Sequence, residues 1–393
     1  MTRIETGQKV IIVGGGIAGL STALALNHVG ICSSVFEKYS FSDRFGAGIQ
    51  LTPNATNILF KFGLEQSLRA TSIEVSDMYI RHWKTDRKLT TIDLRSTIAK
   101  HCSSPYLQIR RAHLIQILSE ACRQYTNIEL FPDEELNSIK SSFDGVSVSS
   151  EKRTLTGPLA VGADGTHSKT REMMRIPHEY QFTGWHAWRT TVKTHSEKDL
   201  SMNVWCGSDG HVIAYPISNL GHLNLVFISK SNEEFENRWR QTGDLVELRE
   251  YFSSWCLQIQ KFIDLIEAKQ LFKWGLFSSK LQKSNWHRER VVLLGDAVHP
   301  ILPFLAQGAA IAIEDAMSLA RVLNSYRNHA DAIQLFVQSR HKRVKMIQDN
   351  SEKMGLVYHM HEPLAKLRDF YTKFAITQLI RSIYAYDTYK IKG

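Results

Sequence analysis

The 393-residue chain is predicted to be an α/β protein, with helices around a parallel sheet, an inserted antiparallel sheet and a C-terminal helical region. Three observations lead to this prediction. At three distant places, a β-branched apolar run ends in a glycine or an acid, as buried parallel strands do. Residues 181–280 change to short alternating segments rich in Trp and Tyr, which is typical of an antiparallel sheet. At 43% hydrophobic and 22% charged residues, the chain has enough apolar side chains for sizeable cores and is not expected to be disordered.

The net charge of +9 raises the question of a nucleic-acid partner. Eleven Lys and Arg against six Asp and Glu fall in residues 331–393, so more than half of the excess belongs to the last sixth of the chain. No helix-turn-helix, zinc-finger or aromatic-basic motif accompanies it. We therefore expect a solvated basic face and no nucleic acid. The sequence does not indicate an oligomeric state.

The five cysteines are an odd number without a CxxC pair. This spacing fits neither a disulfide framework nor a zinc site, so no metal is expected and a cytoplasmic location is the default.

Residues 10–36 contain no Asp, Glu, Lys or Arg and have the length of a membrane span. The run Val10–Val13 is β-branched, however, and three glycines follow it, which neither a membrane helix nor a signal peptide requires. Strand, glycine turn and helix is therefore the preferred interpretation, and no integral membrane segment is expected.

The glycine turn has the pattern Gly14-x-Gly16-x-x-Gly19. In a Rossmann-like fold the first glycine makes a tight turn, the second lets the backbone approach a pyrophosphate, and the third lets the helix pack on the strand. A second strand ends in Glu37, 18 residues after Gly19, where an acid can accept hydrogen bonds from ribose hydroxyls. The pattern therefore predicts a dinucleotide site.

Two more strands end in an acid. The run Arg290–Leu294 leads to Asp296, and a long apolar helix begins after Gln307. A strand-end carboxylate facing a helix start suits a polyol chain followed by an electron-accepting ring, because the helix N-terminus stabilises negative charge on that ring. The run Leu159–Gly162 leads to Asp164.

With these motifs the sequence resembles the FAD-dependent aromatic hydroxylases, the single-component flavoprotein monooxygenases. The matching motifs are GGGIAG with Glu37, GADGTHSKTR at 162–171 and GDAVHPILPFLAQGAAIAIEDA at 295–316, in the family's order and spacing over nearly the whole chain. The resemblance implies FAD as cofactor, with NADH or NADPH as a transient co-substrate and O2 as the oxidant. It implies a discontinuous FAD-binding domain (1–70, 100–180 and 281–330), a substrate-binding sheet domain (71–99 and 181–280) and C-terminal helices (331–393).

The same resemblance implies the cofactor-binding residues. Those around the ADP half of FAD are Gly14, Gly16, Gly19 and Glu37. Those around the rest of FAD are Gly48, Arg111, Asp164, Asp296, Gly308 and Ala309, of which Asp164 also serves the nicotinamide donor. His113 and Arg44 stand where the family has acids, so neither is assigned a role.

Finer features are similar to the salicylate 1-hydroxylase and 3-hydroxybenzoate 6-hydroxylase branch. These are the run 46–55, Tyr215-Pro216 after His211, and a terminal pattern that includes Tyr358-His359, Arg368-Asp369 and Tyr384. Pyridine, urate and polyketide hydroxylases share much of this pattern, so the ring that is hydroxylated stays open.

The inserted sheet is expected over His186–Val192, Asn203–Cys206, Val212–Ile217 and Leu223–Ile228. The resemblance places His211 near the substrate phenol, where an imidazole can take a phenolic proton. A purely structural histidine is the alternative. Tyr215 and Pro303 are expected to contact the substrate, whereas His299, inside the Asp296 motif, is expected to be structural.

The predicted function is hydroxylation of a small phenolic aromatic acid, with salicylate converted to catechol and CO2 as the leading case. The alternatives are another ring (3-hydroxybenzoate, hydroxynicotinate, urate or a polyketide phenol) and a non-enzymatic dinucleotide-binding sensor. An NAD-dependent dehydrogenase would not explain Asp296 and its helix, and a flavin halogenase would need a WxWxIP sequence that the chain lacks.

Overall fold

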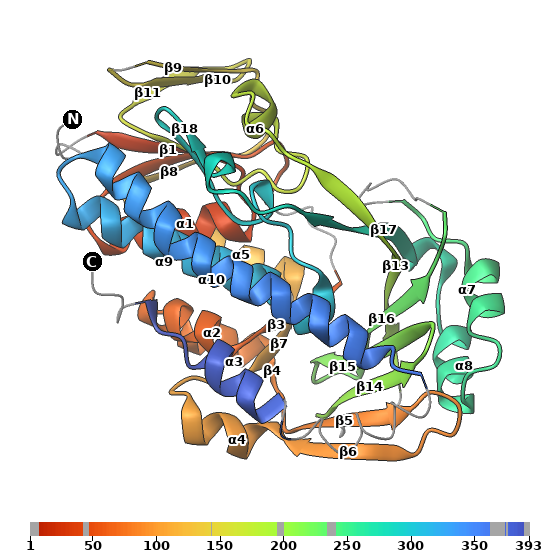
Figure 1. Cartoon of the computed structure of the whole chain (residues 1–393). Coiled ribbons are helices and arrows are strands. Elements are labelled where there is room, and N and C mark those ends of the chain that lie inside the picture. The colour runs from red at the N-terminus through yellow and green to blue at the C-terminus, as the bar shows by residue number, and fades with distance from the viewer. Residues whose placement is uncertain are drawn as a thin grey trace.

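The computed structural model describes residues 8–41, 47–142, 144–194, 200–233, 241–361, 374 and 376–388. Arg44, Arg368 and Asp369, which the sequence comparison singled out, lie outside the described residues. Figure 1 shows a parallel sheet and a larger mixed sheet at opposite ends of the molecule, with the long helix α10 (His329–Tyr358) running from one to the other. The α/β class with helices at the C-terminal side is confirmed.

The first sheet has the strand order β18-β19-β12-β1-β2-β8. Its strands are β1 (Lys9–Val13), β2 (Cys32–Phe36), β8 (Ile128–Phe131), β12 (Ala160–Gly162), β18 (His287–Arg288) and β19 (Val291–Leu293). All neighbours pair in parallel except β18 with β19. The strands that precede the three predicted motifs, β1, β12 and β19, are thus direct neighbours. Because they are parallel, their carboxyl ends meet at one edge of the sheet.

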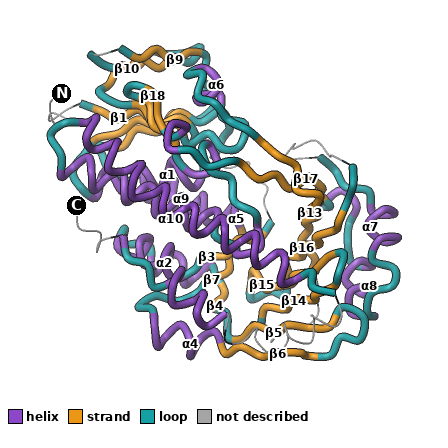
Figure 2. Tube along the Cα trace, in the orientation of Figure 1, coloured by secondary structure: helices purple, strands orange, loops and turns teal. Residues whose placement is uncertain are grey.

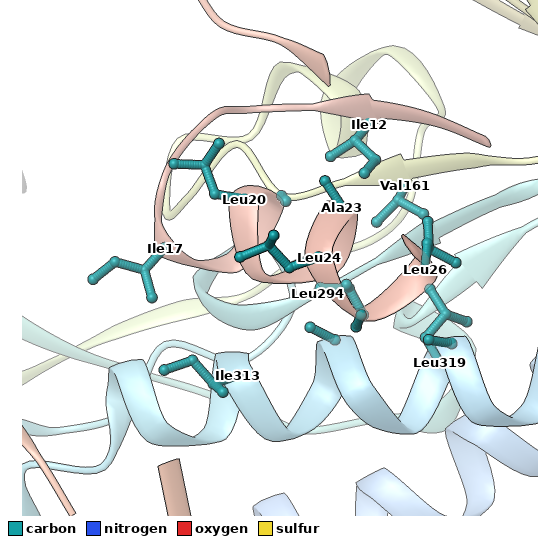
Figure 3. Packing of buried hydrophobic residues seen from close by; sticks show 14 of the residues in the cluster. Ile12, Ile17, Leu20, Ala23, Leu24, Leu26, Val161, Leu294, Ile313 and Leu319 are labelled. Carbon is teal, nitrogen blue, oxygen red and sulfur yellow. The ribbon is translucent and has the colours of Figure 1, made fainter. Parts of the chain in front are cut away.

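Helix α1 (Ile17–His28) lies between this sheet and helix α9 (Gly308–Ser325). Helix α5 (Arg111–Arg123) also packs against α1. Figure 3 shows Leu20, Leu24 and Ile313 in this layer. A helix enclosed on several sides is apolar all round, which explains the uncharged stretch from 10 to 36. Within the described part of the chain, no helix is long and apolar enough to cross a membrane.

The second sheet has seven strands in the order β17-β13-β16-β15-β14-β5-β6. The strands are β5 (Asp77–His82), β6 (Lys88–Asp93), β13 (Tyr180–Lys193), β14 (Met202–Gly207), β15 (Gly210–Ser218), β16 (His222–Lys230) and β17 (Phe272–Ser279). The four predicted strand segments are present, each within a longer strand. The predicted segments pair antiparallel, as expected, whereas β14 and β5, from the distant segment 77–82, pair in parallel. The reason is that the β5–β6 hairpin comes from a distant segment, so no tight turn forces it to run antiparallel to β14.

The two faces of this sheet have different neighbours. Helices α7 (Leu245–Tyr251) and α8 (Leu257–Asp264) cover the outer face, and the C-terminal end of α10 approaches the inner face (Figure 2). Alternate residues of each strand therefore belong to two different cores. The residues of the inner face are the ones that matter for the site.

The remaining elements are short. They are two small sheets, β9 (Ser138–Ser141), β10 (Val146–Ser149), β11 (Thr154–Gly157) and β3 (Gly48–Leu51), β4 (Ile73–Glu74), β7 (Leu107–Arg110), with helices α2 (Pro53–Lys61), α3 (Glu65–Thr71), α4 (Leu94–His101) and α6 (Lys169–Met173). Short 3-10 turns are η1 (Ala268–Gln270), η2 (Lys283–Asn285), η3 (Gly295–Ala297) and η4 (Pro303–Leu305), and η5 (Ile380–Tyr384) is a π-helical turn.

Candidate active site

The glycine turn after β1 has the geometry that a bound pyrophosphate needs. Gly14 has a φ of 104°, and a Cβ there would lie 2.5 Å from the carbonyl oxygen of Ala163. A Cβ on Gly19 would lie 1.8 Å from the Gly14 carbonyl oxygen, so the start of α1 packs on the turn only without a side chain. A Cβ on Gly16 meets nothing within 4 Å. The turn is closed on the protein side and open at Gly16, at the N-terminus of α1.

Glu37 lies at the carboxyl end of β2, directly beside this turn. It is 6% exposed, and its Oε2 accepts a hydrogen bond of 2.6 Å from the Gly15 amide. Its Oε1 accepts one from the Tyr39 amide at 3.0 Å. The carboxylate therefore braces the turn, and it stands at the end of the second strand, where the ribose of a dinucleotide is held in this fold.

Asp296 lies in η3, just beyond the carboxyl end of β19. It accepts no hydrogen bond from any described residue, although it is only partly exposed. Burial raises the pKa of this carboxyl group, and the guanidinium of Arg111 at the start of α5 opposes the increase. Arg111 and Asp296, far apart in sequence, thus act on each other at the sheet edge. A half-buried carboxylate without a donor is suited to accept hydrogen bonds from ligand hydroxyls.

The Asp164 motif has a different local role. The Asp164 carboxylate accepts hydrogen bonds from Ser168 Oγ at 2.5 Å, and from the amide and hydroxyl of Thr170 at 2.9 and 3.0 Å. It therefore shapes the start of α6. Arg171 follows and donates to the Ala297 carbonyl at 2.8 Å, which ties this motif to η3. Because the Asp164 side chain has these partners, its direct role in cofactor binding remains a prediction.

Helix α9 begins at Gly308, as the sequence predicts. A Cβ on Gly308 meets nothing within 4 Å, so the first turn of the helix has free space before it. Ala309 is partly exposed beside it. With the open glycine turn and the unbonded Asp296, the residues present fit an extended dinucleotide with a ring at the α9 N-terminus.

A buried charge network lies beneath the start of α9. Asp315 accepts from His299 Nε2 at 2.6 Å and from Arg340 Nε at 2.7 Å. Arg340 also pairs with Glu314 at 2.9 Å, and all four side chains are 1% exposed or less. Burial would raise the pKa of Asp315, but its interactions with His299 and Arg340 outweigh this and lower the pKa. His299 is thus held inside this network, and its structural role stays a prediction; buried ion pairs join α10 to α9.

Three further polar residues extend this network. Arg343 donates to Glu314 at 2.8 Å, and Asn54 Nδ2 donates to Glu314 at 2.6 Å and to Gln307 Oε1 at 3.1 Å. Gln307 is the residue before α9. The network therefore positions the helix N-terminus, a role that sequence reasoning missed because its members come from α2, α9 and α10.

The inner face of the seven-stranded sheet carries three polar side chains around an apolar centre. His211 and Tyr215 flank Ile213 on β15, and Ile213 is opposite Val226 of β16, which in turn is opposite Arg189 of β13. Residues opposite each other, and alternate residues on one strand, share a face. The three polar side chains therefore surround a floor made by Ile213 and Val226.

Arg189 is the member of this group that sequence reasoning missed. No described carboxylate pairs with it, its Nε is buried without a hydrogen bond, and its guanidinium lies 5.4 Å from the ring centre of Trp274. Burial lowers the pKa of this group, and Tyr215 opposes the decrease. Burial likewise raises the pKa of Tyr215 to about 12, so its phenol is neutral near pH 7.

Gly48 is placed at the contact between strand β3 and this inner face. Its amide donates to Asn224 Oδ1 at 2.6 Å, and a Cβ would lie 2.5 Å from Ile217 and 2.9 Å from Tyr215. The neighbouring Gln50 accepts a hydrogen bond from Tyr106. The requirement for glycine at 48 is thus explained by packing against the sheet, and its contact with a cofactor remains a prediction.

His211 is fully buried. Its Nδ1 is 2.8 Å from Nε2 of His359, and its Nε2 has no hydrogen-bond partner among the residues that the structure describes. Burial lowers the pKa of His211 well below its ordinary value, and His359 adds to the decrease. The ring of Phe304, in the turn η4 that Pro303 begins, is 5.5 Å away. The structure thus brings Pro303's turn and His211 together between the sheet and the start of α9.

These features define a class. Three neighbouring strand ends, an open glycine turn, an unbonded acid and a helix start form an elongated nucleotide site, with a separate sheet facing its far end. Residues 8–351 match the FAD binding domain family, and the chain belongs to this family.

Named relatives agree with this membership. The chain is 29% identical to 3-hydroxybenzoate 6-hydroxylase 1 of Aquipseudomonas alcaligenes over 368 residues, 92% of each chain. It is 30% identical to 6-hydroxynicotinate 3-monooxygenase of Pseudomonas fluorescens over 361 residues, 88% of this chain and 90% of that enzyme. Its fold is similar to that of a salicylate hydroxylase solved as a substrate complex, with a TM-score of 0.79, 21% identity and coverage of 97% and 96%. The protein is an FAD-dependent aromatic hydroxylase, and the predicted family and cofactor are confirmed.

The Asp296→Ala variant is expected to fold but to lose most of its FAD. A hydrogen bond to a charged acceptor contributes roughly 1.5–3 kcal/mol, which is about a 10- to 100-fold change in affinity. The measurement is flavin absorbance per protein after gel filtration, followed by titration of the apoprotein with FAD. Asp264→Ala, a 61% exposed carboxylate on α8, is the control. Full flavin content in the Asp296 variant would contradict the assignment.

Proposed function

We propose that the protein hydroxylates a small phenolic aromatic acid with NAD(P)H and O2, and that salicylate, converted to catechol with loss of CO2, is the first candidate. The observation that supports this most is the inner sheet face, where His211, Tyr215 and Arg189 surround an apolar floor. Such a floor accommodates an aromatic ring, and the polar groups at its margin can orient a hydroxyl and an anionic substituent. Other rings, including 3-hydroxybenzoate, 6-hydroxynicotinate, urate and polyketide phenols, fit the same reasoning.

In this proposal His211 is the base. Bound FAD, once reduced by NAD(P)H, supplies the electrophilic oxygen derived from O2. A phenolate ring attacks an electrophile much better than a neutral phenol does, so the protein must remove the phenolic proton. Among the described residues His211 Nε2 is buried and has no hydrogen-bond partner, and the lowered pKa keeps the imidazole neutral near pH 7, so its lone pair is available to the phenol. Tyr215, whose pKa is raised, would serve as a hydrogen-bond donor to the same oxygen.

Arg189 supports the choice of an acid as substrate. Arginine stays charged in proteins, and a desolvated guanidinium without a carboxylate partner favours binding of an anion. Arg189 is in register with Val226 and Ile213, whereas His211 and Tyr215 lie two residues before and after Ile213 on β15. If the substrate's anionic group bound Arg189, its aromatic ring would therefore lie over Ile213 and Val226. Arg189 and His211 together would then select substrates by the position of the hydroxyl group relative to the acid group.

The Arg189→Gln variant is expected to raise KM for an aromatic acid by about 10- to 100-fold, because it removes a charge-assisted pair of roughly 1.5–3 kcal/mol. The same variant should change KM for the corresponding carboxamide by less than about threefold, which is under the ~1.4 kcal/mol of a tenfold change. Lys193→Gln, an exposed residue at the end of the same strand, is the control. Equal losses for acid and amide would show that Arg189 has only a packing role.

The function itself is tested with holoenzyme and a panel of hydroxybenzoates and hydroxypyridines. Each compound is scored for stimulated NADH and NADPH oxidation, for hydrogen peroxide and for product mass. The substrate is the compound whose product has gained one oxygen atom, or has gained one oxygen atom and lost CO2. Bound FAD with no stimulation by any compound would favour the dinucleotide-binding sensor instead. The cytoplasmic location remains a prediction that this experiment does not address.

A further inference from the structure

His211 cannot complete its proposed task alone. It is 0% exposed, and the rings of Phe304 and Tyr358 lie 5.5 and 5.0 Å from its own. The charge of an imidazolium in such surroundings is poorly solvated, which is the reason for its lowered pKa. A base that takes the phenolic proton must therefore transfer a proton elsewhere in the same event or return it to the phenolate.

The structure provides a second imidazole at the necessary place. His359 immediately follows α10, and its Nε2 is 2.8 Å from Nδ1 of His211. Its ring stacks on Trp185 at 3.9 Å and 17°, which holds its orientation. Burial lowers the pKa of His359 to about 4, so both rings are neutral near pH 7 and share a single hydrogen in the bond between them.

His359 also lies toward the surface. It is 9% exposed, and Asp209 and Lys230 act on its pKa, the first raising it and the second lowering it. Both residues line a hollow of about 550 Å3 between the β14–β15 turn and α7, together with Trp83 and Tyr251. His359 is not among the residues that line this hollow, but the two charged residues that act on its pKa are, so they mark the nearer solvent side.

We propose that His359 is a proton-relay residue that carries the substrate's phenolic proton from His211 toward solvent on the side of Asp209 and Lys230. The inference rests on the proposed function, because it assumes a phenol at His211. The phenolic O–H proton moves to Nε2 of His211, the Nδ1 proton of His211 moves to Nε2 of His359, and the Nδ1 proton of His359 leaves to solvent. One proton leaves and the phenolate keeps the negative charge. The reverse transfers reset both rings when the product oxygen is protonated again.

The other titratable groups near the pair do not replace this route. Burial raises the pKa of Tyr358 far above the working range, so it stays neutral. Cys206, directly opposite His211 on β14, is a buried thiol. Asp209 and Lys230 are the charged groups that act on His359, and they are on the outlet side.

The experiment follows phenol ionisation without turnover. Oxidised holoenzyme is saturated with salicylate or 3-hydroxybenzoate, whichever perturbs the flavin spectrum, and phenolate absorbance is followed after a pH jump by stopped flow. The His359→Gln variant is expected to slow ionisation about tenfold or more, with the affinity for the acid and the FAD content unchanged. Added imidazole should restore the rate, which a purely structural role of His359 would not allow. His341→Gln, a half-buried histidine on the same helix, is the control.

Each outcome is decisive. An unchanged ionisation rate in His359→Gln would overturn the relay while leaving the hydroxylase proposal intact. Failure of every phenolic acid to bind would overturn the proposed function and the relay together. If His359→Gln fails to retain FAD, Asp209→Asn serves instead, because Asp209 lies on an exposed turn and its charge favours the protonated form of His359. That variant should slow ionisation by a smaller factor, and an unaltered rate would again exclude the route.

Discussion

The His211→Ala variant is expected to lower product formation by about 10²–10⁴-fold, the usual contribution of a positioned general base. FAD should stay bound and its reduction by NAD(P)H should stay largely intact, since neither step needs an ionised phenol. NAD(P)H consumption should therefore yield hydrogen peroxide in place of product. The measurement is the ratio of product to peroxide as a function of pH.

The pH dependence separates a base from a merely structural histidine. In the parent enzyme His211 has a lowered pKa, so the neutral form persists as the pH falls and product formation should decline only below about pH 6.5. In His211→Ala, raising the pH should restore part of the product, because hydroxide ionises the phenol instead. His222→Ala, on the neighbouring strand and bonded to Ser218 at 3.0 Å, is the control. A parent-like product ratio at neutral pH would show that His211 is structural.

The Arg340→Met variant is expected to lower the free energy of unfolding by about 3–5 kcal/mol, the usual effect of removing one partner from a buried ion pair. Arg340 is fully buried and bonds both Asp315 at 2.7 Å and Glu314 at 2.9 Å, so its loss leaves two carboxylates with fewer partners. The same network positions the start of α9, so FAD affinity should decrease as well. The measurements are guanidinium unfolding and FAD titration.

An exposed ion pair on the same helix provides the comparison. Lys345 and Asp349 are 3.1 Å apart with side chains 60% and 46% exposed. Lys345→Ala is therefore expected to change stability by less than about 1 kcal/mol. If Arg340→Met lowered the free energy of unfolding as little as Lys345→Ala, the buried carboxylates would have to be neutralised in another way.

The sequence was sufficient to predict the strand ends and the glycine turn of the nucleotide half of the site. A β-branched run followed by glycines constrains its own backbone, because only glycine tolerates the φ of 104° at Gly14 or the contact at Gly19. The acids at the strand ends could be located in the same way, because each directly follows an apolar strand run in the sequence. Parallel strands with intervening helices then place their carboxyl ends at one edge, so the sequence predicts that Glu37 and Asp296 share a site.

The substrate half could be predicted only in outline. Alternation located the strands and the Tyr-Pro pattern indicated His211, but neither gives the pairing between strands. Arg189 became a candidate only because Val226 lies between it and Ile213, and no sequence spacing encodes that register. The parallel pairing of β14 with β5 was unpredictable for the same reason.

The sequence by itself determined what each strand end and glycine turn can bind, because those features depend on backbone conformation within a few residues. The tertiary structure decided which distant side chains share the dry interior. His211 meets His359 across 148 residues, and Glu314 meets Asn54 and Arg343 from two other helices. A buried polar group must find a partner, and only the packing of whole elements selects which one.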